Sequence, residues 1–229
     1  MNKKASSLEN EIIAVFDFDG TIVSKDTGYE FYKWLIKQSS IRVALLAMLL
    51  PLVVLLCMTN SLTRKFGLSI ASYVATAFQS KSLFRLRAEF IHYYFNEKGA
   101  VAYNDALDKI KMHQDNNHQV LIISGCPHWL LSGVVKHIGI RNVKLIGTEL
   151  NLTLTGLLFT NHCFAANKVA MAYSQGFDPK KWRYGYSDST ADIPMLKDCD
   201  HVHVINTNKW QRNKFEALKI GNLIYEKWV

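Results

Sequence analysis

Short apolar runs that end in polar or glycine residues recur along this chain. Residues 12–16 and 120–123 are such runs, and residues 183–186 lead into a third polar group. Runs of this length are typical of buried parallel strands, which deliver side chains to their carboxyl ends. Because ligands of open α/β sheets bind outside those ends, the pattern predicts an α/β fold with a site at one sheet edge.

Apolar residues at helical spacing dominate the stretch between the first two runs. They predict helices at 27–36, 62–78 and 83–95, and a further helix at 103–112 that returns to the sheet. The first three indicate an all-helical cap inserted after the first strand. A cap over a site excludes water and contributes specificity groups.

An uncharged apolar run, residues 43–58, lies within this expected cap and contains Pro51. Its length at about 1.5 Å per residue is roughly 24 Å, shorter than a hydrocarbon core of ~30 Å. Pro51 predicts two short helices with a kink or hairpin. A helix buried in the cap is the alternative. A small cap has little interior to surround such a segment, so we expect an interfacial or re-entrant membrane contact.

The charge balance supports that expectation. The 229 residues carry 27 Lys and Arg against 19 Asp and Glu, a net charge of +8. Each basic residue near an anionic leaflet is worth ~1 kcal/mol. The cations nearest the apolar run are Lys33, Lys37, Arg42, Arg64 and Lys65. No nucleic-acid motif accompanies the positive charge, so the expected partner is an anionic membrane surface and not a nucleic acid.

Other chemistry-bearing residues favour ordinary interpretations. The four cysteines have no metal-type or redox-type spacing, which favours buried thiols in a reducing compartment. His201 and His203 could form a metal pair, but they alternate with valines as in a sheet strand. The first ten residues are polar, and no signal peptide is expected.

Asp17 and Asp19 directly follow the first apolar run, in the sequence DFDGT. Two carboxylates in a partly dry site repel each other, and such a pair usually persists because a divalent cation neutralises it. The alternative is an ordinary strand end, because Asp-Gly is common turn chemistry.

Further polar groups follow in order along the chain. Ser124 and Gly125 follow the second run, where a hydroxyl and the free N–H groups of a following helix suit a phosphate. Lys168 opens an amphipathic stretch, and Asp188 and Asp192 lie four apart after the third strand.

These pieces, DFDGT, the strand ending in Ser124, Lys168 and GYSDSTAD, resemble the four motifs of the haloacid-dehalogenase-like phosphotransferases over almost the whole chain. The resemblance implies a doubly wound, mostly parallel, Rossmann-like sheet with the site at its carboxyl edge. We assign residues 1–24 and 101–229 to this core and residues 25–100 to the inserted cap.

The resemblance also implies roles for the acids. Asp17 is the expected nucleophile, forming an aspartyl phosphate that splits one hydrolysis into two displacements. Asp19 is the expected general acid and then base. The carboxylates of Asp17 and Asp188 and the backbone carbonyl of Asp19 would bind Mg²⁺, leaving positions for waters and a phosphate oxygen.

The phosphoryl oxygens would be held by Ser124, Gly125 and Lys168, with Asp192 supporting Lys168 and the metal shell. Phosphoryl transfer requires mainly positioning and charge stabilisation, which these groups supply. In this superfamily, dehalogenases lack the second acid and ion-pumping ATPases carry Thr there. The retained Asp19 thus implies phosphomonoester hydrolysis or phosphomutase chemistry, and we expect a phosphatase.

Within the phosphoserine-phosphatase-like branch, three segments resemble the bacterial phosphatidylglycerophosphate phosphatases: residues 17–35, the apolar run near Val43, and residues 185–196. This implies removal of the terminal phosphate of phosphatidylglycerophosphate at the inner face of the cytoplasmic membrane. Two positions depart from relatives: Gly20 replaces the Ser of phosphoserine phosphatases, and residues 165–167 lack the glycine common before the lysine.

Two alternatives remain open. The first is a soluble, phosphoserine-like small-metabolite phosphatase with residues 43–58 inside the cap. The second is a non-catalytic phosphate-binding module, which is disfavoured by the complete set of Asp17, Asp19, Ser124, Lys168, Asp188 and Asp192. Candidate substrate-reading residues in the cap are Asp26, Arg64, Lys81, Arg85 and Arg87.

Overall fold

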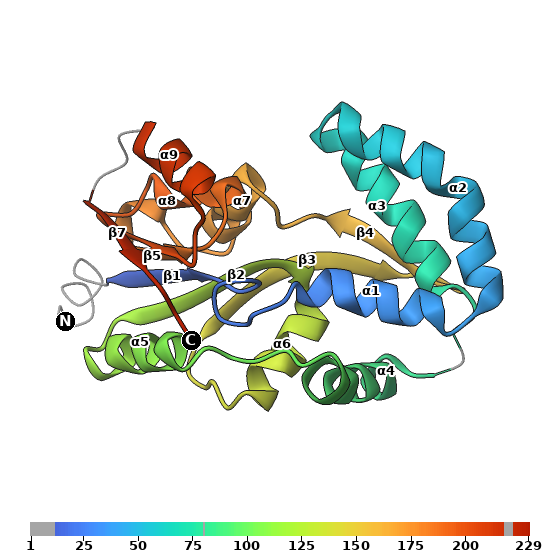
Figure 1. Cartoon of the computed structure of the whole chain (residues 1–229), viewed down its shortest axis with the longest axis horizontal. Helices are drawn as coiled ribbons and strands as arrows, with labels where there is room; N and C mark the ends of the chain where they lie inside the picture. The colour runs from blue at the N-terminus through green and yellow to red at the C-terminus, as the bar shows by residue number, and fades with distance from the viewer. Residues whose placement is uncertain (1–11, 80, 218–221) are drawn as a thin grey trace, which may run out of the picture.

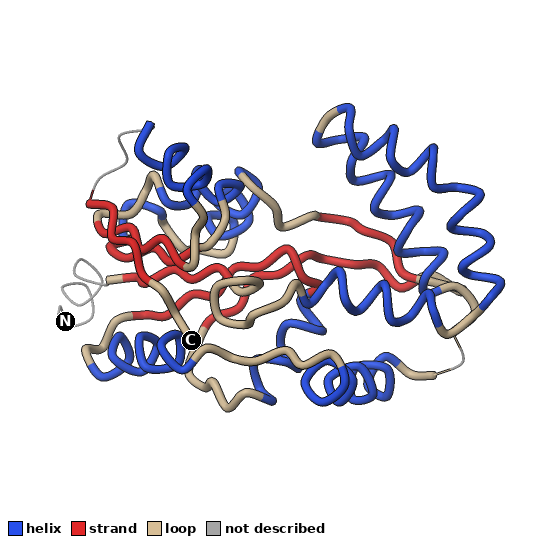
Figure 2. Tube along the Cα trace, in the orientation of Figure 1, coloured by secondary structure: helices blue, strands red, loops and turns tan. Residues whose placement is uncertain are grey.

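A seven-stranded sheet forms the centre of the computed structural model, which describes residues 12–79, 81–217 and 222–229 (Figures 1 and 2). The strands are β1 (Ile13–Asp17), β2 (Gln119–Pro127), β3 (Lys144–Leu152), β4 (Leu157–Asn161), β5 (Trp182–Ser187), β6 (His201–Ile205) and β7 (Asn222–Glu226). Their order is β4-β3-β2-β1-β5-β6-β7, and β4 alone pairs antiparallel. The order reverses direction at β1, so the carboxyl end of β1 lies at a topological switch point.

Both faces of the sheet are covered by helices, as expected for a doubly wound fold (Figure 1). The helices of the core are α5 (Asn104–Asp115), α6 (His128–His137), α7 (Ala166–Ser174), α8 (Ile193–Leu196) and α9 (Lys209–Ala217). Side chains of β1 alternate between two cores: Ala14 and Phe16 pack toward α5 and α6, and Ile13 and Val15 toward α7 and α8. This two-sided burial explains why β1 is a continuous apolar run.

The segment after β1 forms α1 (Thr27–Lys37), α2 (Ser40–Thr59), α3 (Ser61–Thr76) and α4 (Leu83–His92), which continues into the π-helix η1 (Tyr93–Glu97). The predicted helices at 27–36, 62–78 and 83–95 are confirmed to within a few residues. Asp26 caps α1, since its carboxylate accepts a hydrogen bond from Tyr29 N at 2.7 Å.

The helices α3 and α4 pack against different parts of the core. α3 packs along the edge strand β4, where Thr76 Oγ1 accepts a hydrogen bond from Leu157 N at 2.8 Å. α4 packs instead against α6, and Arg87 donates to Trp129 O at 2.8 Å. The assignment of all of residues 25–100 to one cap stays a prediction.

The prediction that Pro51 divides the apolar run into two short helices is wrong. α2 is a single 20-residue helix with Pro51 inside it. Proline removes one helical hydrogen bond, yet the helix continues through Pro51 and packs closely against α3. Gly67 of α3 permits the approach, because a Cβ there would lie 3.0 Å from Val53 O and 2.8 Å from Cys57 Sγ. At about 1.5 Å per residue, α2 is about 30 Å long.

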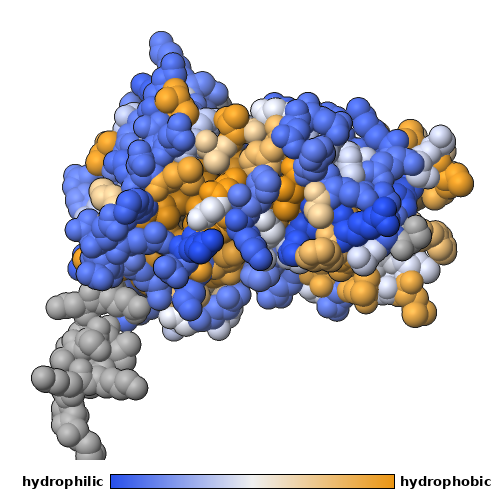
Figure 3. All heavy atoms as spheres, turned by 90° about the horizontal axis from the view of Figure 1, so that it is seen from below, coloured by the Kyte–Doolittle hydropathy of each residue, from blue (hydrophilic) through white to orange (hydrophobic). Residues whose placement is uncertain are grey.

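α2 is also exposed. In the described part of the chain it is the one helix long and apolar enough to cross a membrane. Only 6% of its most apolar 18-residue stretch is buried. Among its residues only Val53 is buried, which contradicts the alternative of a helix enclosed in the cap. Nine large apolar residues of α2, from Ile41 to Met58, are exposed. The face of the molecule seen from below in Figure 3 has, by contrast, apolar patches separated by polar residues.

Candidate active site

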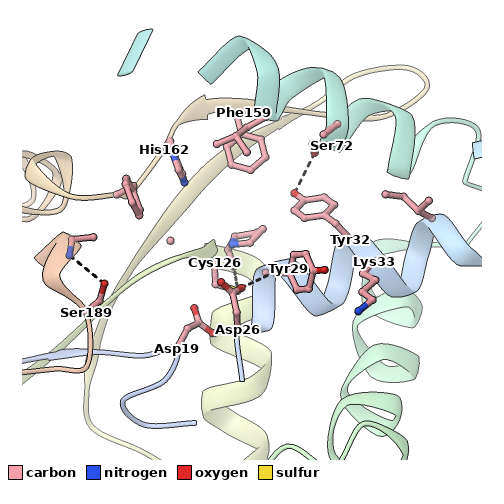
Figure 4. Close-up of a pocket in the computed structure, with 18 of the residues that line it drawn as sticks. Asp19, Asp26, Tyr29, Tyr32, Lys33, Ser72, Cys126, Phe159, His162 and Ser189 are labelled. Carbon is pink, nitrogen blue, oxygen red and sulfur yellow. Dashed lines mark hydrogen bonds between the residues drawn. The ribbon is translucent and has the colours of Figure 1, made fainter. Parts of the chain in front are cut away.

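The carboxyl ends of β1, β2 and β5 and the start of α7 meet at one cavity of about 750 Å³. Asp17, Asp19, Gly125, Lys168 and Asp192 line it (Figure 4 shows this region). Residues that are up to 175 positions apart in the chain are thus brought together at the switch point, as the sequence predicts.

Lys168 is the centre of a buried charge network. Its Nζ lies 2.6 Å from Asp17 Oδ1 and 2.7 Å from Asp192 Oδ1. Asp192 Oδ2 in turn accepts a hydrogen bond from Ser187 Oγ at 2.7 Å. Burial opposes the charge on Lys168, but the two carboxylates raise the pKa of its ammonium group above the ordinary value. Lys168 therefore stays charged, which its predicted role as a phosphate ligand requires.

Asp17 experiences opposing effects. Burial raises the pKa of its carboxyl group, and the Lys168 ammonium group opposes that rise. Its second oxygen lies 3.3 Å from Thr21 Oγ1, and Thr21 Oγ1 also lies 3.2 Å from Asp188 Oδ1. Since one hydroxyl carries one proton, Thr21 can satisfy only one of these two carboxylates at a time.

Because Thr21 cannot donate to both carboxylates at once, a cation bound between Asp17 and Asp188 would suit this site. Asp17 and Asp188 present oxygen ligands to the same region, and burial raises the pKa of Asp188 to about 6. An all-oxygen donor set suits Mg²⁺. Within the described ranges no three His, Cys, Asp or Glu side chains converge as a metal cluster. The expected set needs only two side-chain carboxylates and the Asp19 carbonyl, so the residues fit the ion.

Gly20 allows Asp188 to approach β1. Its φ is +82°, and a Cβ there would lie 2.4 Å from Asp188 Oδ2. The departure from the Ser of phosphoserine phosphatases is therefore accompanied by a close backbone contact with a predicted metal ligand.

Asp19 points into the cavity and is held as an acceptor (Figure 4). Its carboxylate accepts hydrogen bonds from Thr27 N at 2.7 Å and Ser124 Oγ at 2.8 Å. Burial, with the charge of Asp26 as a smaller cause, raises the pKa of Asp19 to about 6 despite these bonds. A carboxyl group with this pKa can both donate and accept a proton near neutral pH.

Ser124 is placed beside Asp19 by its own partners. Its hydroxyl donates to Asp19 and accepts from Cys126 N at 2.9 Å, and the side chain is fully buried. The predicted contact with a phosphoryl oxygen stays a prediction, because here the Ser124 proton is used by Asp19. Gly125 does line the cavity.

The loop before Lys168 is strained at Ala165. Its φ of +50° and ψ of −129° form a combination that side chains disfavour and glycine adopts readily. The missing glycine noted in the sequence is thus replaced by an alanine in a glycine-like conformation.

The candidate substrate-reading residues do not lie together in the structure. Among them Asp26 lines the cavity. Lys81 and Arg85 pair with Glu89 on the surface, Arg87 binds the Trp129 carbonyl, and Arg64 donates to Cys57 O at 3.3 Å.

Several site residues were not assigned roles from the sequence. Thr21 was visible in the DFDGT motif, but its bridging position between two carboxylates depends on a residue 167 positions away. Gln211 holds the Asp188 carbonyl with a 2.9 Å hydrogen bond from a distant helix. His162, which lines the cavity, follows an edge strand that the apolar pattern did not predict.

The far end of the cavity is apolar. It lies between α1, α2, α3 and β4 and is lined by Tyr29, Tyr32, Ile36, Val43, Leu46, Leu68, Ala71 and Phe159. Ser72 donates a 3.2 Å hydrogen bond to the Tyr32 hydroxyl across this end (Figure 4). Lys33 and Lys37, one turn apart on α1, also line the cavity.

Comparison with known proteins agrees with this arrangement. Residues 14–197 match the haloacid dehalogenase-like hydrolases. A curated relative, the "Inhibition of morphological differentiation protein" of Streptomyces azureus, is 28% identical over 136 residues, which are 53% of this chain and 44% of that protein. This chain therefore spans less than half the length of that relative.

Solved structures share the fold at low identity. A protein of unknown function from Bordetella pertussis Tohama I has a TM-score of 0.71 at 17% identity, covering 94% of this chain and 98% of that one. A substrate-bound phosphoserine phosphatase has a TM-score of 0.57 at 14% identity, covering 93% and 92%. Since the family match covers residues 14–197 and the motif residues converge on one cavity, this chain belongs to the haloacid dehalogenase-like hydrolases.

Proposed function

We propose that this protein is a Mg²⁺-dependent phosphomonoesterase whose substrate is amphiphilic, a lipid headgroup phosphate such as that of phosphatidylglycerophosphate. The observation that carries the proposal is the composition of one cavity. Asp17, Asp19 and Lys168 lie at one end, and aliphatic and aromatic side chains of α1, α2, α3 and β4 line the other. A cavity with these two ends suits a phosphate joined to an apolar tail.

In the proposed mechanism, an Asp17 carboxylate oxygen attacks phosphorus and the bond to the ester oxygen breaks. Asp19 gives its proton to the departing alkoxide. A water then attacks the phosphoryl group, Asp19 takes its proton, and the bond to Asp17 breaks, which releases inorganic phosphate.

Charge stabilisation comes from groups already in place. Lys168, 2.6 Å from Asp17 and 2.7 Å from Asp192, would hold a phosphoryl oxygen, and its contact with Asp192 would keep it oriented. Mg²⁺ held by Asp17, Asp188 and the Asp19 carbonyl would supply further positive charge to the phosphoryl group.

We further propose that α2 contacts the anionic inner face of a bacterial cytoplasmic membrane. Val43 and Leu46 of α2 line the cavity, while Leu50 and Val54 are about half exposed at 49% and 45%. An acyl chain could thus stay near the lipid while its headgroup phosphate reaches Asp17.

The flanking cations contribute unequally to this contact. Lys37 at the cavity rim is exposed and can face anionic lipid. Arg42 is instead used inside the protein, since its guanidinium donates to Leu35 O at 3.4 Å and Ala77 O at 3.1 Å. Only part of the local positive charge is therefore available to a membrane.

A soluble phosphoserine-like phosphatase is the second candidate. It is favoured by the shared fold of the substrate-bound phosphoserine phosphatase, which covers 93% of this chain. A small hydrophilic ester, however, would leave the apolar end of the cavity unused.

The substrate test compares Mg²⁺-dependent phosphate release from phosphatidylglycerophosphate in mixed micelles with release from phosphoserine in buffer. Asp17→Asn is the control for contaminating phosphatase. We expect strong preference for the lipid. Preference for phosphoserine would establish the second candidate, and turnover of p-nitrophenyl phosphate alone would discard both substrates and keep the mechanism.

The membrane test is sedimentation with anionic liposomes. The double variant Leu50→Glu, Val54→Glu should lose binding and keep hydrolysis of p-nitrophenyl phosphate. Met112→Glu on α5, where the side chain is 41% exposed, is the matched control and should bind normally. Detergent-free self-association that the double variant abolishes, without liposome binding, would assign the α2 face to a second copy instead.

A further inference from the structure

His162 lies where the polar and apolar ends of the cavity meet. It follows β4 and lines the cavity together with Gly125 and Lys168 on one side and Phe159 on the other. Figure 4 shows its ring extending from the end of β4 into the cavity that Asp19 also faces. The mechanism proposed above gives His162 no role.

Hydrogen bonds connect the backbone at residues 162 and 163 with the end of β2 and the start of α7, the two elements that carry Gly125 and Lys168. Thr148 Oγ1 accepts a hydrogen bond from Cys163 N at 3.1 Å and donates to Gly125 O at 2.6 Å. Asn167, which precedes the cavity lysine, donates from Nδ2 to His162 O at 2.7 Å. The position of His162 relative to the predicted phosphate site is therefore set by hydrogen bonds on both sides.

Two aromatic rings orient the imidazole. It stacks on Phe164, with ring centroids 5.4 Å apart and planes 4° apart, and it meets Phe159 edge-on at 5.5 Å. No hydrogen bond or ion pair joins the ring nitrogens to another residue in the described part of the chain. A Cβ placed on Gly125 would lie 4.0 Å from Nε2, so this nitrogen faces the Gly125 side of the cavity.

The imidazole is uncharged at neutral pH. Burial, followed by the positive charges of Arg64 and Lys168, lowers the pKa of His162 to about 4. A neutral imidazole carries one N–H donor and one acceptor. Since a phosphate group offers mainly acceptor oxygens, the N–H is the group that a phosphate would use.

We propose that His162 donates a hydrogen bond from Nε2 to an oxygen of the substrate's phosphate group, beside Gly125 and Lys168. This inference rests on the proposed function insofar as the ligand is a phosphate. The competing explanation is a histidine that only fills space between Phe159 and Phe164, and it predicts no loss of phosphate affinity when the ring nitrogens are removed.

The experiment measures binding of inorganic phosphate by calorimetry in the presence of Mg²⁺. His162→Phe keeps a ring between the two phenylalanines and removes the donor. It should weaken phosphate binding by about 10- to 100-fold, the effect of losing a hydrogen bond to a charged group. His162→Gln restores an N–H donor and should recover part of that loss.

His137→Phe is the matched control. His137 is also a stacked histidine, with its ring 4.8 Å from that of Phe95, but it is exposed on α6 and away from the cavity. This variant should bind phosphate as the wild type does. With p-nitrophenyl phosphate, His162→Phe should raise KM more than it lowers kcat.

Phosphate affinity of His162→Phe within twofold of wild type, at an unchanged melting temperature, would overturn the inference. Equal weakening in His162→Phe and His162→Gln would also overturn it, because only packing would then matter. Phosphate binding that depends on His162 in a protein that hydrolyses no phosphate ester would refute the proposed function and leave this inference standing. A wild type that hydrolyses phosphate esters but binds no phosphate would overturn this inference and leave the proposed function standing.

Discussion

At the β1 end of the cavity each charged side chain has hydrogen-bond or ion-pair partners, whereas the end between α1, α2 and α3 is held mainly by packing. Lys168 contacts two carboxylates and Asp19 accepts two hydrogen bonds. At the other end, Ile36, Leu46 and Leu68 offer only apolar surface. The difference suggests that the chemistry depends on a few fixed atoms, and that substrate choice depends on a surface which tolerates change.

The largest effect is expected at the polar end. Asp19→Asn removes the proposed proton donor and acceptor, so hydrolysis of p-nitrophenyl phosphate should fall ~10²–10⁴-fold, the usual contribution of acid–base catalysis. Asp115→Asn, on an exposed ion pair with Lys111 of α5, is the control. Normal turnover by Asp19→Asn would show that the assigned role is wrong.

Near the polar end of the cavity, the buried His113 of α5 contacts Tyr186 of β5. His113 is fully buried, with Nε2 2.8 Å from the Tyr186 hydroxyl, and Tyr186 stacks on Phe16 of β1. Burial, with smaller effects of His118, His203 and Lys109, lowers the pKa of His113 to about 4.

The lowered pKa of His113 predicts a pH dependence of stability. In the unfolded chain His113 is protonated below its ordinary pKa of ~6.5, whereas in the folded protein it is protonated only below a pKa of about 4. The contribution of neutral His113 to the free energy of unfolding is therefore fully present above pH 6.5, and up to about 3 kcal/mol of it should be lost between pH 6.5 and 4. Denaturant titrations at several pH values would measure this, and His113→Phe should show a shallower dependence. An equally steep dependence in the variant would assign the effect to other groups.

A smaller effect is expected at the apolar end. Ala71→Trp on α3 would fill part of the cavity and should lower kcat/KM for a long-chain alkyl phosphate about tenfold, comparable to losing one or two buried methylene contacts. Hydrolysis of p-nitrophenyl phosphate should stay near the wild-type rate. Equal losses on both substrates would mean that the two ends are not separable.

The smallest effect concerns the strained loop. Ala165→Gly should stabilise the fold by about 1 kcal/mol, because glycine adopts the observed backbone conformation without strain. Ala170→Gly, inside α7, is the control and should destabilise it by a similar amount. A lower melting temperature for Ala165→Gly would indicate that the loop is unstrained.

The sequence predicted the core of the fold because its signals are local. β1 is buried on both faces and is therefore one apolar run, and the polar residues at strand ends follow directly from the chain order. The acids, Ser124 and Gly125 were named from their places at strand ends, whereas Lys168 was named from the family resemblance, and the structure brings them to one sheet edge.

What the sequence missed depends on contacts between distant segments. The helix α2 continues through Pro51 and packs against α3 at Gly67, and no local pattern contains that contact. His162 follows a short edge strand, and the groups near it come from β2, from α7 and, through the charge of Arg64, from α3. Substrate-reading residues were sought among charged positions, whereas the far end of the cavity is mostly apolar.

The central claim is that one cavity binds a phosphate at its polar end and an apolar tail at its other end. The most direct test is kcat/KM for a series of alkyl phosphates of increasing chain length, kept below their micelle concentrations, with Mg²⁺ present. We predict a rise with each added methylene, by at most about fourfold per group, until the cavity is filled. A flat series, or a preference for the shortest ester, would contradict the account.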